Sequence, residues 1–303
     1  MSTEFALVLS YMNDNYFISY NWTPTIAHHV LDASEEFYRS VGVGRLHNKN
    51  SINPMAVQSG DILCVKTDYI YDGTFQREIL PFISNPFVLI TGISSYCVSK
   101  GFNISSILDS PMLIRWFCTN CPDINHPKLS ALPIGFEEKE RAGGSTEALS
   151  TAFKSSSLFA VKKSKILLPY HTSNTNPQRL SLVNAIGRHP FVEVQTSKLP
   201  FKDYLSLLDK YKFVICLEGS GPDVHRNYET LLVHSVPINI KNVIQPLFEA
   251  HDLPGLFLDS WSQLTDRFFS DILDEDFSFE NSDCFLTQSY HKKIIYESRS
   301  SNR

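Results

Sequence analysis

Short runs of consecutive apolar residues, many of them β-branched, recur along this chain and alternate with longer stretches of mixed polarity. A run that is apolar at every position, rather than at every second position, predicts a strand covered on both faces, as in a parallel sheet. We therefore expect strands at residues 60–67, 86–92, 165–170, 191–194, 212–217, 236–240 and 255–258.

The stretches between these runs predict helices at residues 177–188, 200–211, 225–234 and 262–273. Pro177 and Pro200 stand where a first helical turn tolerates proline, because the N–H group at that position needs no partner within the helix. Strands that alternate with helices are typical of βαβ units. The predicted fold is therefore α/β, with parallel, doubly wound sheets.

The composition shifts at residues 137–164 toward Ala, Gly, Ser, Thr and charged residues, which predicts a linker at 141–164 that could contain one helix. An α/β pattern lies on either side. The simplest architecture is two Rossmann-like domains facing each other across a cleft, an N-terminal one at 1–140 and a C-terminal one at 165–285. A closing helix is expected at about 286–300, and it could pack back on the first domain.

Composition and charge exclude several classes of protein. Of 303 residues, 43% are hydrophobic and 19% charged, which is ordinary for a globular protein. A net charge of −5 argues against a dedicated nucleic-acid binder, which needs a basic face. No apolar run approaches the roughly 18 residues of a membrane span, and no basic leader precedes one. We expect a soluble protein of the reduced cytoplasm.

The most informative segment is 213–229, where a predicted strand is followed by a Gly-Ser-Gly turn and a helix start. Ser220 and Gly221 would let a ligand approach the backbone, and the N–H groups of a helix start attract phosphate. Arg226 could bind a diphosphate, and Glu229, on the same helical face, could accept bonds from ribose hydroxyls. Alternatively, Asp223 is an N-cap, and Arg226 and Glu229 form an exposed ion pair.

A second segment, residues 169–179, follows another predicted strand and places Arg179 in the first turn of the next helix. Loops at the carboxyl ends of neighbouring parallel strands share one crevice, so Arg179 and Arg226 could converge on one anion. The alternative is a solvated Ser/Thr/Asn loop with an arginine that extends into solvent.

Together these segments resemble the exostosin family of glycosyltransferases, family 47. The resemblance rests on Thr175-Asn-Pro-x-Arg179, on Gly219-x-Gly221-x-x-x-His225-Arg226-x-x-Glu229 and on Val236-Pro-Ile, with weaker support from 86–92, 116–121 and 132–136. It covers about residues 60–262. Two departures stand out: Tyr228 replaces the usual Trp, and His234-Ser235 replaces a Gly before the Val-Pro-Ile strand. The chain looks like a compact, stand-alone version without the anchor and stem of animal and plant members, as found in microbes and large DNA viruses.

The resemblance implies a GT-B fold, with a nucleotide-sugar donor on the second domain and an oligosaccharide or glycoprotein acceptor on the first. It implies a hexosyl- or pentosyltransferase that transfers the sugar of a UDP-sugar with inversion of configuration at the anomeric carbon. Among the donors used in the family we prefer UDP-xylose, because a small enzyme of this type could modify a viral or microbial surface glycan. The donor site would comprise Thr175, Arg179, Ser220, Gly221, Arg226 and Glu229.

The resemblance also implies that no metal or other cofactor is needed, since GT-B enzymes stabilise the leaving diphosphate with cationic groups and helix dipoles. Two short motifs, one acidic and one of cysteines, have the spacing of metal ligands. Asp274-Glu-Asp276 follows a predicted helix and fits a solvated acidic run better than a metal site. Cys118 and Cys121 lack a second ligand pair, which favours buried thiols.

An inverting reaction needs a general base that takes the proton of the acceptor hydroxyl. Residues 67–73 follow the first predicted strand and offer Asp72 and Asp68 as bases, with Tyr69 and Tyr71 to stack on a sugar. Asp72 precedes Gly73, so it could equally be a turn residue. The other candidates are Glu78, His28 and His29.

Two rival functions remain open from the sequence. One is a non-catalytic carbohydrate- or nucleotide-binding module on a degenerate glycosyltransferase fold, which would bind ligand without forming product. The other is a Rossmann-type oxidoreductase, although the glycine fingerprint for a dinucleotide is incomplete after Gly219 and Gly221.

Overall fold

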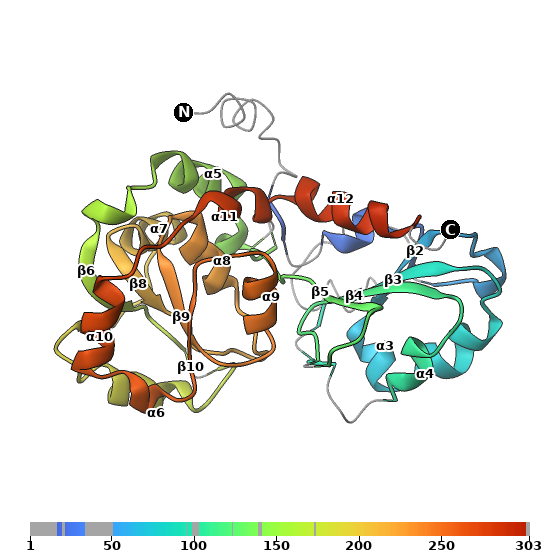
Figure 1. Cartoon of the computed structure of the whole chain (residues 1–303), viewed down its shortest axis with the longest axis horizontal. Coiled ribbons are helices and arrows are strands. Elements are labelled where there is room, and N and C mark those ends of the chain that lie inside the picture. The colour runs from blue at the N-terminus through green and yellow to red at the C-terminus, as the bar shows by residue number, and fades with distance from the viewer. Residues whose placement is uncertain are drawn as a thin grey trace. The chain divides into compact units, whose positions relative to one another are not determined.

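A computed structural model of the chain describes residues 17–19, 22–33, 51–94, 96–98, 103–122, 124–138, 141–172 and 174–300. The chain divides into two compact units (Figure 1). We call Ile18–Ile134 with Gln288–Arg303 the N-terminal unit, and Met1–Phe17 with Gly135–Thr287 the C-terminal unit. Parts of the expected first domain, namely 1–16, 20–21, 34–50, 95, 99–102, 123 and 139–140, lie outside the described residues.

The C-terminal unit contains a five-stranded parallel sheet in the order β10-β9-β8-β6-β7. Its central strands are buried almost throughout, which explains why their sequences are continuous apolar runs. The five runs that predict strands in this half of the chain all form strands: β6 (Lys163–Leu168), β7 (Val192–Val194), β8 (Tyr211–Ile215), β9 (Val236–Ile240) and β10 (Leu256–Leu258).

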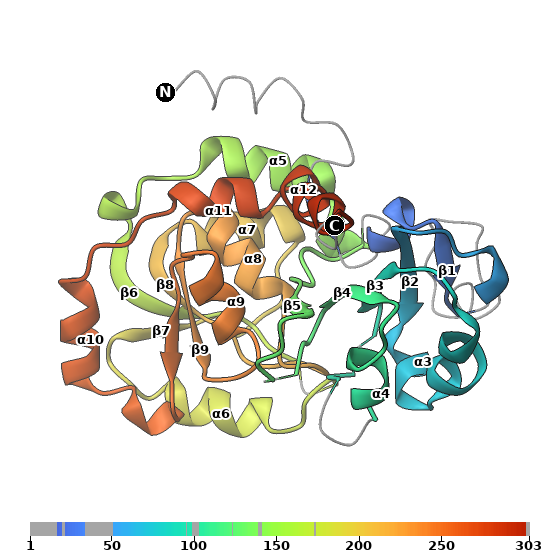
Figure 2. The same cartoon turned by 45° about the vertical axis from the view of Figure 1, so that its right-hand side comes forward.

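Helices cover both faces of this sheet. In Figures 1 and 2, α6 and α10 lie on one face and α7 and α8 on the other. This is the arrangement that right-handed crossovers produce when the strand order reverses. The helices of the unit are α5 (Thr146–Ser155), α6 (Arg179–Ile186), α7 (Phe201–Leu208), α8 (His225–Leu232), α9 (Gln245–Ala250), α10 (Asp266–Leu273) and α11 (Glu280–Phe285).

The strand order of the C-terminal unit reverses between β6 and β8. From β6 the chain proceeds to β7 on one side, and then crosses to β8, β9 and β10 on the other. The loops after β6 and β8 therefore diverge at the carboxyl edge of the sheet and leave a crevice between them. In open α/β sheets this reversal is where ligands bind.

The N-terminal unit contains a second five-stranded parallel sheet, in the sequential order β1-β2-β3-β4-β5. The order has no reversal among the described strands, so this sheet departs from the expected doubly wound pattern. Two strands match the apolar runs at 60–67 and 86–92; the other three were not predicted. The strands are β1 (His29–Leu31), β2 (Asp61–Lys66), β3 (Phe87–Gly92), β4 (Leu113–Cys118) and β5 (Leu129–Ala131).

A sheet wound in sequential order with right-handed crossovers carries its crossover helices on one face only. Here α3 (Thr67–Tyr71) and α4 (Ser105–Leu108) lie on one side of the sheet and α12 (Gln288–Ser298), from the end of the chain, on the other (Figure 1). This explains how β3 can be buried at every position. None of the described helices is long and apolar enough to cross a membrane.

The segment 141–164 contains α5, as the sequence allows. Leu149 and Phe153 of α5 are buried, and the helix packs against α7 within the C-terminal unit. Other helix boundaries differ from the expected ones by a few residues. The helix expected at 262–273 begins at Asp266, because the Thr265 side chain caps it by accepting a bond from Phe268 N.

Candidate functional site

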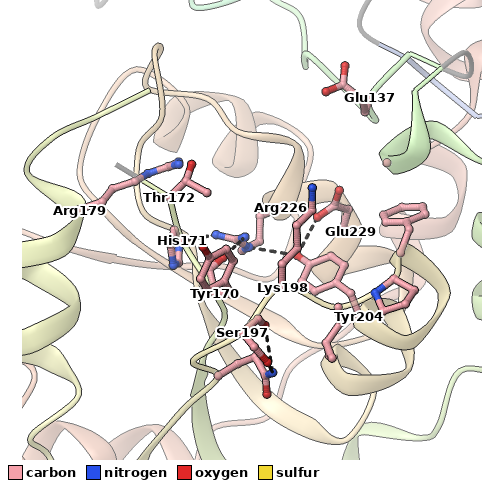
Figure 3. Close-up of a pocket in the computed structure, with 15 residues that line it drawn as sticks. Glu137, Tyr170, His171, Thr172, Arg179, Ser197, Lys198, Tyr204, Arg226 and Glu229 are labelled. Atoms are coloured by element: carbon pink, nitrogen blue, oxygen red, sulfur yellow. Dashed lines mark hydrogen bonds between the residues drawn. The ribbon is translucent and has the colours of Figure 1, made fainter. Parts of the chain in front are cut away.

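A pocket of about 450 Å³ opens at the reversal of strand order in the C-terminal unit. Its walls come from the loop after β6, the segment after β7, and helices α7 and α8. Figure 3 shows Arg226 between His171 on one side and Tyr204 and Glu229 on the other. The polar and charged residues that line it include Glu137, His171, Arg179, Lys198, Tyr204, Arg226 and Glu229.

The guanidinium of Arg226 is held at three points. Its Nε donates to the Tyr204 hydroxyl at 3.0 Å and its Nη2 to the Tyr170 carbonyl at 3.2 Å, while its Nη1 donates to Nε2 of His171. A guanidinium has five N–H donors, so one remains on each terminal nitrogen. Those two donors form a fork that suits one phosphate group.

His171 is a neutral hydrogen-bond acceptor in this pocket. Its Nδ1 donates to the Pro169 carbonyl at 2.5 Å, which leaves Nε2 to accept the bond from Arg226. Burial, reinforced by the charges of Arg226 and Arg179, lowers the pKa of His171 to about 2. The ring therefore positions Arg226 without neutralising its charge.

Arg179 shows the same pattern of fixed and remaining donors. Its Nε donates to the Glu218 carbonyl at 2.8 Å and its Nη2 to the Leu217 carbonyl at 2.9 Å, and its Nη1 donates to Thr175 Oγ1 at 3.1 Å. These bonds tie the start of α6 to the loop after β8. Burial, and after it the charge of Arg226, lower the pKa of Arg179 to about 10.

The two guanidiniums are thus close enough to repel each other, and no carboxylate of the described residues forms an ion pair with either. Within the described part of the chain, the arginines that form ion pairs with carboxylates at 4.0 Å or less are Arg141 and Arg267. A pocket with two unneutralised cations favours the binding of an anion, which would relieve their repulsion. Two forks match the two phosphates of a diphosphate.

Glu229 lies one helical turn after Arg226 and is linked to it through Tyr204. The Tyr204 hydroxyl donates to Glu229 Oε2 at 2.8 Å while it accepts from Arg226 Nε. Burial raises the pKa of Glu229, although Arg226 and Tyr204 oppose this shift. Arg226 and Glu229 are therefore joined through a phenol, and the alternative of a direct, exposed ion pair is wrong.

The turn after β8 positions the arginines. Gly219 N donates to the Gly221 carbonyl at 3.0 Å, and a Cβ at Gly219 would lie 3.2 Å from Nη2 of Arg179. Ser220 is exposed and Gly221 half-buried in this turn, and neither is among the residues that line the pocket. The N-cap of α8 is Val224, not Asp223.

The expected acceptor-side residues all belong to the N-terminal unit, whereas every residue that lines the pocket belongs to the C-terminal unit. Asp72 is exposed at the end of α3, and its Oδ1 accepts from Thr74 N at 2.8 Å. Gly73 has φ +78°, so Asp72 does occupy a turn. Asp68 pairs with Lys66 at 2.9 Å, and Glu78 is exposed.

The two tyrosines of α3 have different surroundings. The Tyr69 hydroxyl donates to the Asp32 carbonyl at 3.3 Å. Tyr71 is 55% exposed, and its ring stacks on Tyr96 with centroids 4.8 Å apart. The remaining candidates, His28 and His29, lie 3.9 and 2.9 Å from Asp61 at the opposite end of β2 from α3.

The two side chains that hold Arg226 in the pocket, His171 and Tyr204, had no role predicted from the sequence. His171 lies in the quoted segment 169–179, and Tyr204 lies in the helix that precedes β8. The order of the strands was the missing signal, because it places the start of α7 beside the loop after β6. Among the described residues no group of three or more His, Cys, Asp or Glu could hold a metal ion. Cys118 and Cys121 are buried thiols.

No protein-family model and no curated protein matches this chain. Among solved structures it is similar to a GtfA/B complex, with 9% identity and a TM-score of 0.37 over 81% of this chain and 58% of that one. It is also similar to a glycosyltransferase from Rickettsia africae, with 12% identity and a TM-score of 0.41 over 88% of each chain. An α1,3-fucosyltransferase shares 13% identity, with a TM-score of 0.27 over 76% of this chain and 95% of that chain.

Proposed function

We propose that this protein is a glycosyltransferase that moves a sugar from a nucleoside diphosphate donor to a hydroxyl group of a glycan. The observation that carries the proposal is the pair Arg179 and Arg226. Both guanidiniums lie at the reversal of strand order, each keeps one N–H donor on each terminal nitrogen, and neither pairs with a described carboxylate. This is a site for a diphosphate.

In this proposal Arg179 and Arg226 bind the two phosphates, and Glu229 accepts bonds from the ribose hydroxyls. Thr175, Ser220 and Gly221 belong to the two loops that carry the arginines and lie toward the donor. The base is uracil and the sugar xylose, following the resemblance to the exostosin family. Oligosaccharides and glycoproteins are the acceptors.

The proposed reaction inverts the configuration at C1 of the transferred sugar. A base from the N-terminal unit, Asp72 or else Asp68, takes the proton of the acceptor hydroxyl, while Tyr69 and Tyr71 hold the acceptor. The acceptor oxygen forms a bond to C1 of the sugar as the bond from C1 to the phosphate oxygen breaks. The negative charge that develops on the leaving diphosphate is stabilised by the two guanidiniums, which supply the positive charge that a metal supplies in other enzymes.

The proposal is tested by a thermal-shift panel of UDP, GDP, UDP-sugars, NAD and NADP, followed by transfer assays with the ligand that binds. We expect UDP and UDP-sugars to stabilise the protein, by about 2.7 kcal/mol at one hundred times the dissociation constant, and a UDP-sugar to be consumed. Binding without turnover would favour a non-catalytic binding module. Stabilisation by NAD or NADP alone would favour an oxidoreductase.

A further inference from the structure

The Tyr204 side chain lies between two oppositely charged residues of α8, Arg226 and Glu229. Its hydroxyl lies 3.0 Å from Arg226 Nε and 2.8 Å from Glu229 Oε2. We propose that Tyr204 is a positioning residue that separates Arg226 from Glu229, so that the cation stays available for phosphate and the carboxylate for ribose. This inference rests on the proposed function.

The direction of the hydrogen bonds follows from counting protons. Arg226 Nε can only donate, so it occupies a lone pair of the Tyr204 oxygen. The single phenolic proton then points to Glu229. Burial raises the pKa of Tyr204 well above its usual value, so the phenol keeps that proton throughout the physiological range. The chain of bonds therefore has one stable arrangement, from guanidinium to phenol to carboxylate.

Without the hydroxyl, the two charged side chains would pair directly. Residues three apart on a helix lie on one face, and an arginine and a glutamate in these positions attract each other. Glu229 is 7% exposed, so it needs a partner for its charge. The remaining anchors of Arg226, the His171 ring and the Tyr170 carbonyl, carry no charge that could hold the guanidinium away from a carboxylate.

A direct pair would neutralise the fork that the phosphate requires and would occupy the carboxylate that the ribose requires. Tyr204 lies on α7, where its ring packs near that of Phe201, with the two ring centroids 6.2 Å apart. The guanidinium carbon of Arg226 lies 5.8 Å from the centre of the Tyr204 ring. A phenylalanine would keep these ring contacts and remove the hydroxyl alone.

The test measures binding of inorganic pyrophosphate and of UDP by isothermal titration to the whole protein and to Tyr204→Phe. We expect Tyr204→Phe to bind pyrophosphate at least about tenfold more weakly, a loss typical of a hydrogen bond to a charged group. Its melting temperature should stay close to that of the wild type, because the new ion pair replaces the two lost bonds. A merely structural role for Tyr204 would lower stability and leave pyrophosphate affinity unchanged.

A second substitution tests the separation directly. In Tyr204→Phe/Glu229→Gln the neutral amide cannot form the ion pair, so we expect pyrophosphate affinity to return to within about threefold of the wild type. Affinity for UDP should stay reduced, because the ribose carboxylate is gone. Should Tyr204→Phe fail to fold, the double variant compared with Glu229→Gln alone carries the test, and pyrophosphate binding lost in the double variant only would overturn the inference.

Tyr211 offers a matched control. Its hydroxyl accepts from Lys163 Nζ at 3.3 Å and donates to Glu193. Here the cation and the carboxylate also pair directly, at 3.2 Å, and none of the three residues lines the pocket. Tyr211→Phe should bind pyrophosphate and UDP like the wild type. If the wild type binds pyrophosphate and Tyr204→Phe binds it equally well, this inference fails and the proposed function stands. If the wild type binds neither pyrophosphate nor UDP, both fail.

Discussion

Arg226 donates a hydrogen bond from Nη1 to Nε2 of His171, and His171 can accept that bond only as a neutral ring. The buried ring has its pKa lowered to about 2, against a usual value near 6.5. The same side chain takes up a proton near pH 6.5 in the unfolded chain. The two states therefore bind different numbers of protons at mildly acidic pH.

The first prediction concerns the pH dependence of stability. Above pH 6.5, His171 is neutral in both states and has no effect. Below pH 6.5 the unfolded chain binds one more proton than the folded protein. The free energy of unfolding should therefore decrease as the pH decreases, by up to about 1.4 kcal/mol per pH unit. His171→Gln keeps an acceptor for Arg226 and removes the titration. Urea unfolding at pH 7.5, 5.5 and 4.5 should show a shallower dependence for this variant. Parallel curves for the two proteins would disprove the neutral state of His171.

His234 provides a second prediction, about stability alone. It has φ +52°, a left-handed conformation that favours glycine, and its ring lies 3.2 Å from Ser156 Oγ and 3.0 Å from Asp283 Oδ1. We expect His234→Ala to lower the free energy of unfolding by about 1 to 3 kcal/mol, because the strain stays and both bonds are lost. His234→Gly should be more stable than His234→Ala by about 1 kcal/mol. Equal stability of the two variants would show that the backbone strain is absent.

The third prediction concerns the proton of the acceptor. Asp72→Asn retains an oxygen for the bond from Thr74 N, so it preserves the turn and removes the basic carboxylate. If Asp72 is the base, kcat should fall by roughly 10² to 10⁴ while affinity for UDP stays nearly unchanged. Asp68→Asn, which removes the carboxylate of the pair with Lys66, serves as the milder comparison. A kcat near that of the wild type in Asp72→Asn would transfer the role to Asp68 or Glu78.

The fourth prediction identifies the sugar. Hydrolysis of UDP-xylose, UDP-glucuronic acid, UDP-N-acetylglucosamine, UDP-galactose and UDP-arabinose is compared at equal concentration and without acceptor. We expect the fastest release of UDP from UDP-xylose. Faster turnover of any hexose donor would rule out the xylose preference and leave the assignment of the diphosphate site intact.

Much of the fold follows from local sequence, because strands buried on both faces are continuous apolar runs. The strands that escaped prediction lack that signal: β1 has one buried residue, β5 has none, and β4 is interrupted by Arg115. The sequential order of the N-terminal sheet depends on pairings between distant segments, which no local pattern reports.

The placement of Arg179, Arg226 and Glu229 in one pocket could be predicted, because both arginines lie in the first turn of a helix that follows a strand and Glu229 lies one turn after Arg226. Tyr204 and His171 could not, because their roles arise from contacts with Arg226 across 22 and 55 residues of sequence. The direction of the bonds through Tyr204 also required the structure, since Arg226 and Glu229 alone suggest a direct pair.

The central claim is that Arg179 and Arg226 together bind a diphosphate, and it is tested most directly by isothermal titration of UDP. The variants are Arg179→Ala, Arg226→Ala and, as a control, Arg267→Ala, whose side chain is 91% exposed in the same unit. We predict that the wild type and Arg267→Ala bind UDP equally, and that each pocket variant loses at least about tenfold in affinity, as expected when a charge-assisted bond to phosphate is removed. Unchanged affinity in Arg226→Ala, or no binding of UDP by the wild type, would contradict the account.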